Sequence, residues 1–212
     1  MLKLGIKDLS KPENLERKLP VVFKIDITPE EYAFIKENFK FEDLHIDLHY
    51  MYFDTDLSSR KAALRKNEIR LRVKLKKSKY FLELKRKRKK SEAGKENEDF
   101  ELGDEISPEA FREMLRGNLP VGTVKDKLIK LGLFAPMQLM HTTHTTRRKI
   151  DFHHGELVID ATDYDSGKDY QIEFRSDRIF TQDKIDKIKA ELGISKRQTA
   201  RKSKLEKIWH DK

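Results

Sequence analysis

The chain has 212 residues, which is enough for one domain with a buried core. Its 46 lysine and arginine residues outnumber 37 aspartate and glutamate residues, and the net charge of +9 favours polyanionic partners such as phosphorylated ligands or nucleic acid. The absence of cysteine excludes disulfide bonds, thiol nucleophiles and Cys-ligated zinc. No run approaches the roughly 20 apolar residues of a membrane span, so we expect a single cytoplasmic domain over residues 1–212 with no membrane partner.

Several segments alternate between apolar and charged residues, as strands do when their two faces differ chemically. The run EIRLRVKL from Glu68 places Arg70, Arg72 and Lys74 on one face and aliphatic residues on the other. The run KYFLELKRK from Lys79 divides its leucines from its charged residues in the same way. We also predict strands at NLERKLPV (14–21), DFEL (99–102), GELVID (155–160) and DYQIEF (169–174).

Helical segments are predicted between these strands. Thr28 offers an N-cap before Pro29, which predicts a helix that runs to about Asn38. Ser107 precedes Pro108 in the same manner and predicts a second helix. Further helices are predicted at VKDKLIKLG (124–132), DKIDKIKAEL (183–192) and, for a last turn or two, KSKLEKIW (202–209).

The alternating segments are compatible with two sheet architectures. In an open antiparallel sheet the charged face meets water, whereas in a closed barrel it points into a hydrated channel and the apolar face lies outward under the helices. Alternation alone favours the open sheet, which is commoner. The charge-dense segment 86–97 has little to bury and is predicted to be a mobile loop.

A series of short motifs runs along the chain. The segments NLERK (14–18), YFDT (52–55), IRLR (69–72) and FLELK (81–85) are followed by TTR (145–147), GELVID (155–160), DYQIEF (169–174) and SK (203–204). The series resembles, in the same order and over nearly the whole chain, the ExExK, YFDT, LRIR, TLK and later motifs of bacterial CYTH proteins, the triphosphate tunnel superfamily. The form FLELKRK also resembles the polyphosphate-polymerase relatives of that superfamily.

This resemblance implies an α+β fold, an antiparallel eight-stranded closed β-barrel (a triphosphate tunnel) with helices packed outside. Cations on the inner face would bind phosphates, and carboxylates would hold Mg²⁺ or Mn²⁺. The implied substrate-binding residues are Lys18, Arg70, Arg72, Lys85, Arg147 and Lys204. The implied metal ligands are Glu16, Glu101, Glu173 and Glu83, with Asp99 and Asp160 as further candidates. The implied catalytic residues are Glu16, Glu173 and Lys85.

Three positions depart from the family pattern by lacking an acid. Asn14 replaces the first glutamate of ExExK, Gln171 stands at the first position of the late ExE pair, and Arg175 follows where another acid is frequent. Each change removes a negative charge from the implied metal side, so divalent-metal affinity is expected to fall.

The resemblance implies binding of a triphosphate-containing small molecule or polyphosphate, with metal-dependent hydrolysis of a phosphoanhydride bond. One alternative is a non-catalytic module that binds polyphosphate or RNA and whose metal site has decayed. Others are the adenylyl cyclase and polyphosphate polymerase activities of the superfamily. Nucleic acid is a secondary expectation, because the basic run Lys85–Lys90 lacks the interleaved aromatic residues that stack on bases.

The histidines carry weaker signals. The segment HTTHTTRR is predicted to be a strand, which would place His141 and His144 on opposite faces and prevent them from sharing a metal ion. His153, His154 and Gly155 are predicted to form a hairpin turn.

Overall fold

The computed structural model describes residues 19–41, 45–55, 62–86, 100–165 and 167–194. The predicted loop at 86–97, apart from Arg86, and the predicted last helix at 202–209 lie outside these ranges, as does most of the predicted first strand at 14–21.

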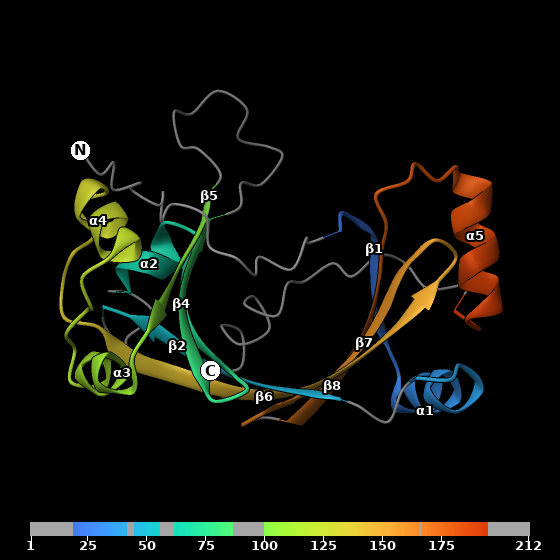
Figure 1. Cartoon of the computed structure of the whole chain (residues 1–212), viewed down its shortest axis with the longest axis horizontal. Coiled ribbons are helices and arrows are strands. Elements are labelled where there is room, and N and C mark those ends of the chain that lie inside the picture. The colour runs from blue at the N-terminus through green and yellow to red at the C-terminus, as the bar shows by residue number, and fades with distance from the viewer. Residues whose placement is uncertain (1–18, 42–44, 56–61, 87–99, 166, 195–212) are drawn as a thin grey trace, which may run out of the picture.

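The described strands form one antiparallel sheet. They are β1 (Val21–Ile27), β2 (Ile46–Asp54), β3 (Ile69–Lys76), β4 (Lys79–Arg86), β5 (Phe100–Ile106), β6 (Gln138–Phe152), β7 (Gly155–Tyr164) and β8 (Gly167–Arg175). Their order across the sheet is β1-β8-β7-β6-β2-β3-β4-β5. Figure 1 shows that the sheet is strongly bent, with β1 and β5 on opposite sides of its concave face.

Hydrogen bonds among the described strands do not close the sheet, so the structure does not support the prediction of a closed barrel. Among the described strands, β1 pairs with β8 and β5 pairs with β4, and no hydrogen-bonded register joins β1 to β5. The bend places the edge strands β1 and β5 on opposite sides of the hollow, but their backbones are not paired. A closed barrel requires hydrogen bonds between these two strands.

The described helices are α1 (Pro29–Asn38), α2 (Ala63–Lys66), α3 (Pro108–Leu115), α4 (Thr123–Lys130) and α5 (Gln182–Glu191). Four of these five described helices, α1, α3, α4 and α5, lie where the sequence patterns predicted helices. At the start of α1, the Thr28 hydroxyl accepts a hydrogen bond from the Glu31 N–H at 3.2 Å, and the Glu31 carboxylate accepts one from the Thr28 N–H at 2.7 Å. This capping box explains why the helix begins at Pro29. Within the described ranges, none of the helices combines the length and the apolar character needed to span a bilayer.

Two hydrophobic cores lie between the helices and the convex face of the sheet (Figure 1). In the first core, Leu71 of β3 packs with Met114 of α3 and Leu128 of α4. In the second, Ile172 of β8 packs with Ile35 of α1 and Ile188 of α5. Because the apolar side chains face the helices, the alternate residues of the same strands must face the hollow.

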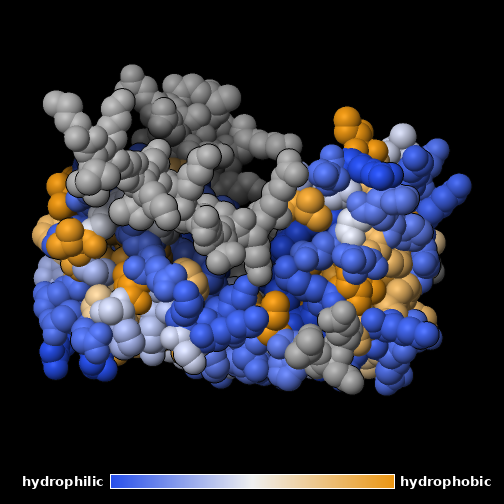
Figure 2. Space-filling model, viewed as in Figure 1, coloured by the Kyte–Doolittle hydropathy of each residue, from blue (hydrophilic) through white to orange (hydrophobic). Residues whose placement is uncertain are grey.

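The surface agrees with this division. Figure 2 shows hydrophobic residues mainly near the two ends of the molecule, where the helices lie, and mostly hydrophilic residues between them.

The hairpin prediction is confirmed, because His153 and His154 have φ angles of 44° and 59° and connect β6 to β7.

Candidate functional site

Charged side chains from seven of the described strands gather on the concave face. In an antiparallel sheet, residues directly opposite each other point to the same face. Arg72 is opposite Glu83, Lys85 is opposite Glu101, and Arg147 is opposite Asp160. The register also aligns Glu156 with Arg175 and Lys24 with Glu173. The concave face therefore carries two clusters of cations and carboxylates.

The first cluster lies on β3, β4 and β5. It comprises Arg70, Arg72, Lys74, Glu83, Lys85 and Glu101. Arg72 Nε donates to Glu83 Oε2 at 2.6 Å, and Lys74 Nζ contacts Glu83 Oε1 at 2.6 Å. Lys85 Nζ contacts Glu101 Oε2 at 2.5 Å. Both oxygens of Glu83 are therefore engaged by cations.

Electrostatics keeps the Arg72–Glu83 pair ionised. Burial alone would raise the pKa of Glu83, but the nearby charges of Arg72 and Lys74 outweigh burial and lower it. Burial alone would lower the pKa of Arg72, and Glu83 reverses that effect and raises it. The Arg72 guanidinium also lies 4.2 Å from the centroid of the Tyr50 ring, a cation–π contact that helps to fix its position.

Arg70 differs from its neighbours in the first cluster. Within the described residues it makes no hydrogen bond or ion pair, although the side chain is partly buried on the concave face. Burial, and next the positive charge of Arg72, lower the pKa of Arg70. A guanidinium in this situation gains more from a bound anion than one that already has a carboxylate partner.

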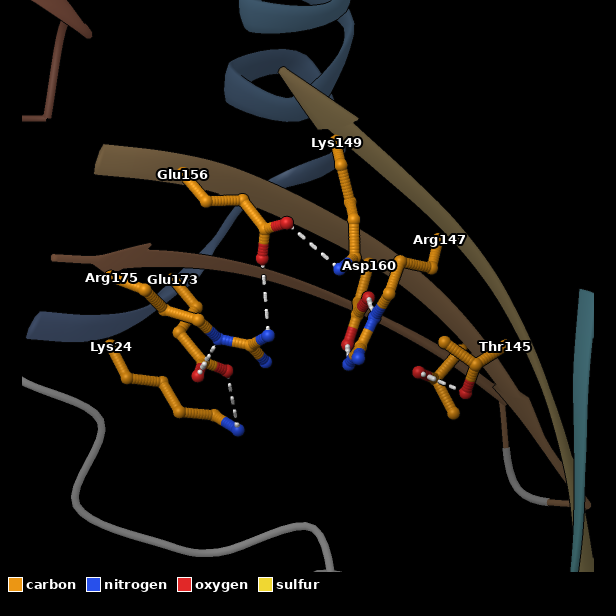
Figure 3. A network of polar contacts seen from close by, with 9 residues as sticks. Lys24, Thr145, Arg147, Lys149, Glu156, Asp160, Glu173 and Arg175 are labelled. Atoms are coloured by element: carbon orange, nitrogen blue, oxygen red, sulfur yellow. Dashed lines mark hydrogen bonds and ion pairs between the residues drawn. The ribbon is translucent and has the colours of Figure 1, made fainter. Parts of the chain in front are cut away.

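The second cluster lies on β6, β7, β8 and β1. It comprises Lys24, Arg147, Lys149, Glu156, Asp160, Glu173 and Arg175, which Figure 3 draws as sticks. Arg147 donates to Asp160 from Nε at 2.7 Å and from Nη2 at 2.8 Å, a bidentate pair. This pairing raises the pKa of Arg147, although burial alone would lower it.

Glu173 and Glu156 share one guanidinium in this cluster. Arg175 Nε donates to Glu173 Oε1 at 2.7 Å, and Arg175 Nη1 donates to Glu156 Oε1 at 3.2 Å (Figure 3). Lys24 lies 3.5 Å from Glu173 Oε2, and Lys149 lies 2.8 Å from Glu156 Oε2. Burial alone would raise the pKa of Glu173, but the Arg175 hydrogen bond and the charge of Lys24 lower it.

A neutral strip separates the two clusters. Tyr50 and Tyr52 of β2 are buried there, and the Thr145 and Thr162 hydroxyls are 3.0 Å apart. Among the described atoms, the buried Thr143 hydroxyl has no hydrogen-bond partner. The middle of the concave face therefore offers hydroxyl groups rather than charges.

The predicted substrate-binding residues divide into two sets. Arg70, Arg72, Lys85 and Arg147 all lie on the concave face, as the alternation predicted for the first three. Lys18 and Lys204 lie outside the described residues, and so do Glu16 and Asp99 of the predicted metal and catalytic sets. Their roles stay predictions.

The described acids do not form a ready divalent-metal site. Glu83, Glu101, Glu173 and Asp160 face the hollow, but each is paired with lysine or arginine. No group of three or more aspartate, glutamate or histidine side chains within the described ranges is arranged to hold a metal ion. The described part of the predicted metal set therefore does not fit Mg²⁺ or Mn²⁺ as it stands.

Several members of the second cluster were not predicted from the sequence. Lys24 was not predicted because no strand was predicted over Val21–Ile27, although the alternation of VVFKIDI was a signal for one. Lys149 and Glu156 were not predicted as a pair, because only the β6–β7 hairpin brings Lys149 Nζ to Glu156 Oε2. The histidine prediction is confirmed, because His141 is opposite Tyr52 and His144 is opposite His49, on the other face.

Asp54, in the YFDT segment, has a structural role. Its carboxylate accepts hydrogen bonds from the backbone N–H groups of Leu64 at 3.0 Å and Arg65 at 2.9 Å. These are backbone donors at the start of α2 that the helix itself leaves unpaired. The interaction fixes α2 against the end of β2.

Fold and site define a class of α+β proteins in which a bent, eight-stranded antiparallel sheet carries helices outside and ion pairs inside. The model of the CYTH domain matches residues 13–203. The chain belongs to the CYTH domain family, as its motifs predicted. A search of curated protein sequences found no match.

Solved structures share this fold. A candidate adenylate cyclase from Bacillus halodurans is 21% identical, with a TM-score of 0.70, and the match covers 90% of this chain and 97% of that chain. A candidate adenylyl cyclase from Hippeastrum, described as having a dominant triphosphatase activity, is 18% identical with a TM-score of 0.69, covering 86% of this chain and 91% of that one. At these identities the similarity establishes the fold alone.

The ion-paired glutamates predict how stability depends on pH. An unfolded glutamate titrates near about 4.3, and the pKa of Glu83 is lower in the folded chain. Below about pH 5 the unfolded chain therefore binds more protons, and the free energy of unfolding falls as the pH decreases toward the folded pKa. Denaturant unfolding between pH 3 and pH 6 should show a shallower fall for Glu83→Gln than for the unchanged chain. The exposed Glu105→Gln should keep the original slope, and equal slopes for all three proteins would contradict the prediction.

Proposed function

We propose that the concave face binds a triphosphate-containing small molecule or a polyphosphate chain. The observation that carries the proposal is the gathering of cations from separate strands on one face, with Arg70 lacking a partner among the described residues. Family membership supports the same ligand class. Lys18 and Lys204 are proposed to contribute from outside the described ranges.

The ion pairs support phosphate binding because they orient the cations before the ligand arrives. Asp160 holds Arg147 through Nε and Nη2, which leaves Nη1 for a phosphate oxygen. Glu83 holds Arg72 beside Arg70 through contacts of Arg72 Nε and Nη2 with Glu83 Oε2. A guanidinium with fixed orientation loses less conformational entropy on binding, and its N–H groups match the geometry of phosphate oxygens.

The finer proposal is hydrolysis of a phosphoanhydride bond. Water adds to the terminal phosphorus, the bridging P–O bond breaks, and triphosphate yields diphosphate and phosphate. When bound, Mg²⁺ or Mn²⁺ would supply charge neutralisation of the phosphates. We propose that the described carboxylates position the cations. Glu173 holds Arg175 and Lys24, and Glu101 holds Lys85. The cations therefore stay in place as negative charge develops on the leaving group.

A second candidate function is non-catalytic binding of polyphosphate or RNA. The specific observation in its favour is that the described carboxylates of both clusters are paired with lysine or arginine.

The binding proposal predicts a specific defect for Arg70→Ala. Loss of a charge-assisted hydrogen bond costs about 1.5–3 kcal/mol, so the Kd for inorganic triphosphate should rise roughly 10- to 100-fold. Arg112→Ala is the matched control, since it removes the same charge from the exposed surface of α3. Calorimetric titration checks both variants, and equal affinities for Arg70→Ala and Arg112→Ala would contradict the assignment.

The hydrolysis proposal predicts phosphate release that depends on Glu173. Inorganic triphosphate, thiamine triphosphate, nucleotides and long polyphosphate are each incubated with Mg²⁺ or Mn²⁺, and at least one should release phosphate. Glu173→Ala should lower the rate roughly 100-fold, because Arg175 and Lys24 lose their positioning partner, while triphosphate still binds.

The exposed Glu191→Ala serves as a control and should release phosphate at the original rate. Tight binding without release from any substrate would reject hydrolysis and support the second candidate.

A further inference from the structure

Arg175 lies between two carboxylates on the concave face. It donates to Glu173 Oε1 at 2.7 Å and to Glu156 Oε1 at 3.2 Å, and its side chain is only 9% exposed. The remaining oxygens of the two carboxylates contact Lys24 and Lys149 (Figure 3). Each of the four carboxylate oxygens therefore already faces one cation.

This arrangement leaves no oxygen of the pair for a metal ion. Divalent cations such as Mg²⁺ and Ca²⁺ bind carboxylate oxygens at about 2.0–2.6 Å, and they prefer sites with an excess of negative charge. Here Lys24, Lys149 and Arg175 supply more positive charge than Glu156 and Glu173 can balance. A divalent ion would have to displace Arg175 and leave its guanidinium without a partner, which is costly for a buried charge.

The backbone holds Arg175 in this place. Gly155, at the start of β7, packs so closely that a Cβ there would lie 2.2 Å from the Arg175 carbonyl oxygen and 2.9 Å from Phe174 Cε2. Arg175 is also opposite Glu156 in the β7–β8 register and opposite Val21 in the β1–β8 register. The arginine is therefore fixed by strands on both sides, and a shift that vacates the position is unfavourable.

We infer that Arg175 is a built-in cation that occupies the place between Glu156 and Glu173 in which a divalent metal ion would otherwise be bound. A guanidinium tethered to β8 supplies one positive charge that neither dissociates nor depends on metal concentration. Arg175 Nε and Nη1 hold the carboxylates, and Nη2 makes no hydrogen bond to a described residue, so it can donate to a phosphate oxygen. Only this last role rests on the proposed function.

The test is binding of Mn²⁺ alone, measured without any phosphate ligand by calorimetry and by the electron paramagnetic resonance signal of free Mn²⁺. Arg175→Glu removes the cation and adds a third carboxylate beside Glu156 and Glu173. It should bind one Mn²⁺ at least tenfold more tightly than the unchanged chain.

Lys149→Glu is the matched control. It makes the same change of charge beside the same Glu156 but leaves Arg175 in place, so it should gain no such affinity. Equal gains in the two variants would show that net charge alone governs metal binding and would overturn the inference. The inference would also be overturned if Arg175→Glu gained no affinity for Mn²⁺. The same holds if the unchanged chain already bound Mn²⁺ tightly and Arg175→Glu did not improve that binding.

A second variant guards against a folding defect in Arg175→Glu. Arg175→Gln leaves Glu156 and Glu173 close together without their shared partner, so its thermal unfolding midpoint should fall and should recover when Mn²⁺ is added. A midpoint that Mn²⁺ does not raise would count against the inference. Because no phosphate is present, failure here is distinct from failure of triphosphate binding, which the unchanged chain tests separately.

Discussion

The alternation of apolar and charged residues along the strands constrains everything else in this molecule. Leu71 and its equivalents have to be buried, and the helices cover them on the convex side of the sheet. The charged residues between them, such as Arg70 and Arg72, then have to share the concave side. The cationic face is therefore a consequence of how the core is packed. The bend of the eight-stranded sheet turns that face toward a common hollow (Figure 1).

The carboxylates on the concave face reduce the net positive charge that these cations create there. Without Glu83 and Asp160, Arg72 and Arg147 would be partly buried charges with no partner, which destabilises a fold. With them, each guanidinium is fixed and still has donors to spare. Arg70 is the exception within the described residues, and so it marks the place where an incoming anion gains most. Stability and the proposed binding thus depend on the same ion pairs.

Much of the fold was predictable because its signals are local. The Thr28 capping box, the His153–His154 turn and the faces of β3 and β4 each follow from a few neighbouring residues. Whether the sheet closes was not predictable from the sequence. Closure depends on whether β1 and β5 pair, and no short segment determines the distance between them. The pairing of Arg175 with Glu156 could not be predicted from the sequence either. The two residues are 19 positions apart and come together only through the β7–β8 register. Single cations could be assigned to a face from sequence, whereas their partners could not.

The most direct test of the central claim is a crystal structure of the chain with inorganic triphosphate. The account predicts that the phosphates lie in the hollow against the concave face, within hydrogen-bonding distance of Arg70 and of Arg147 or Arg72. Phosphates bound instead on the helix-covered convex side, with the concave ion pairs untouched and no ligand in the hollow, would contradict it.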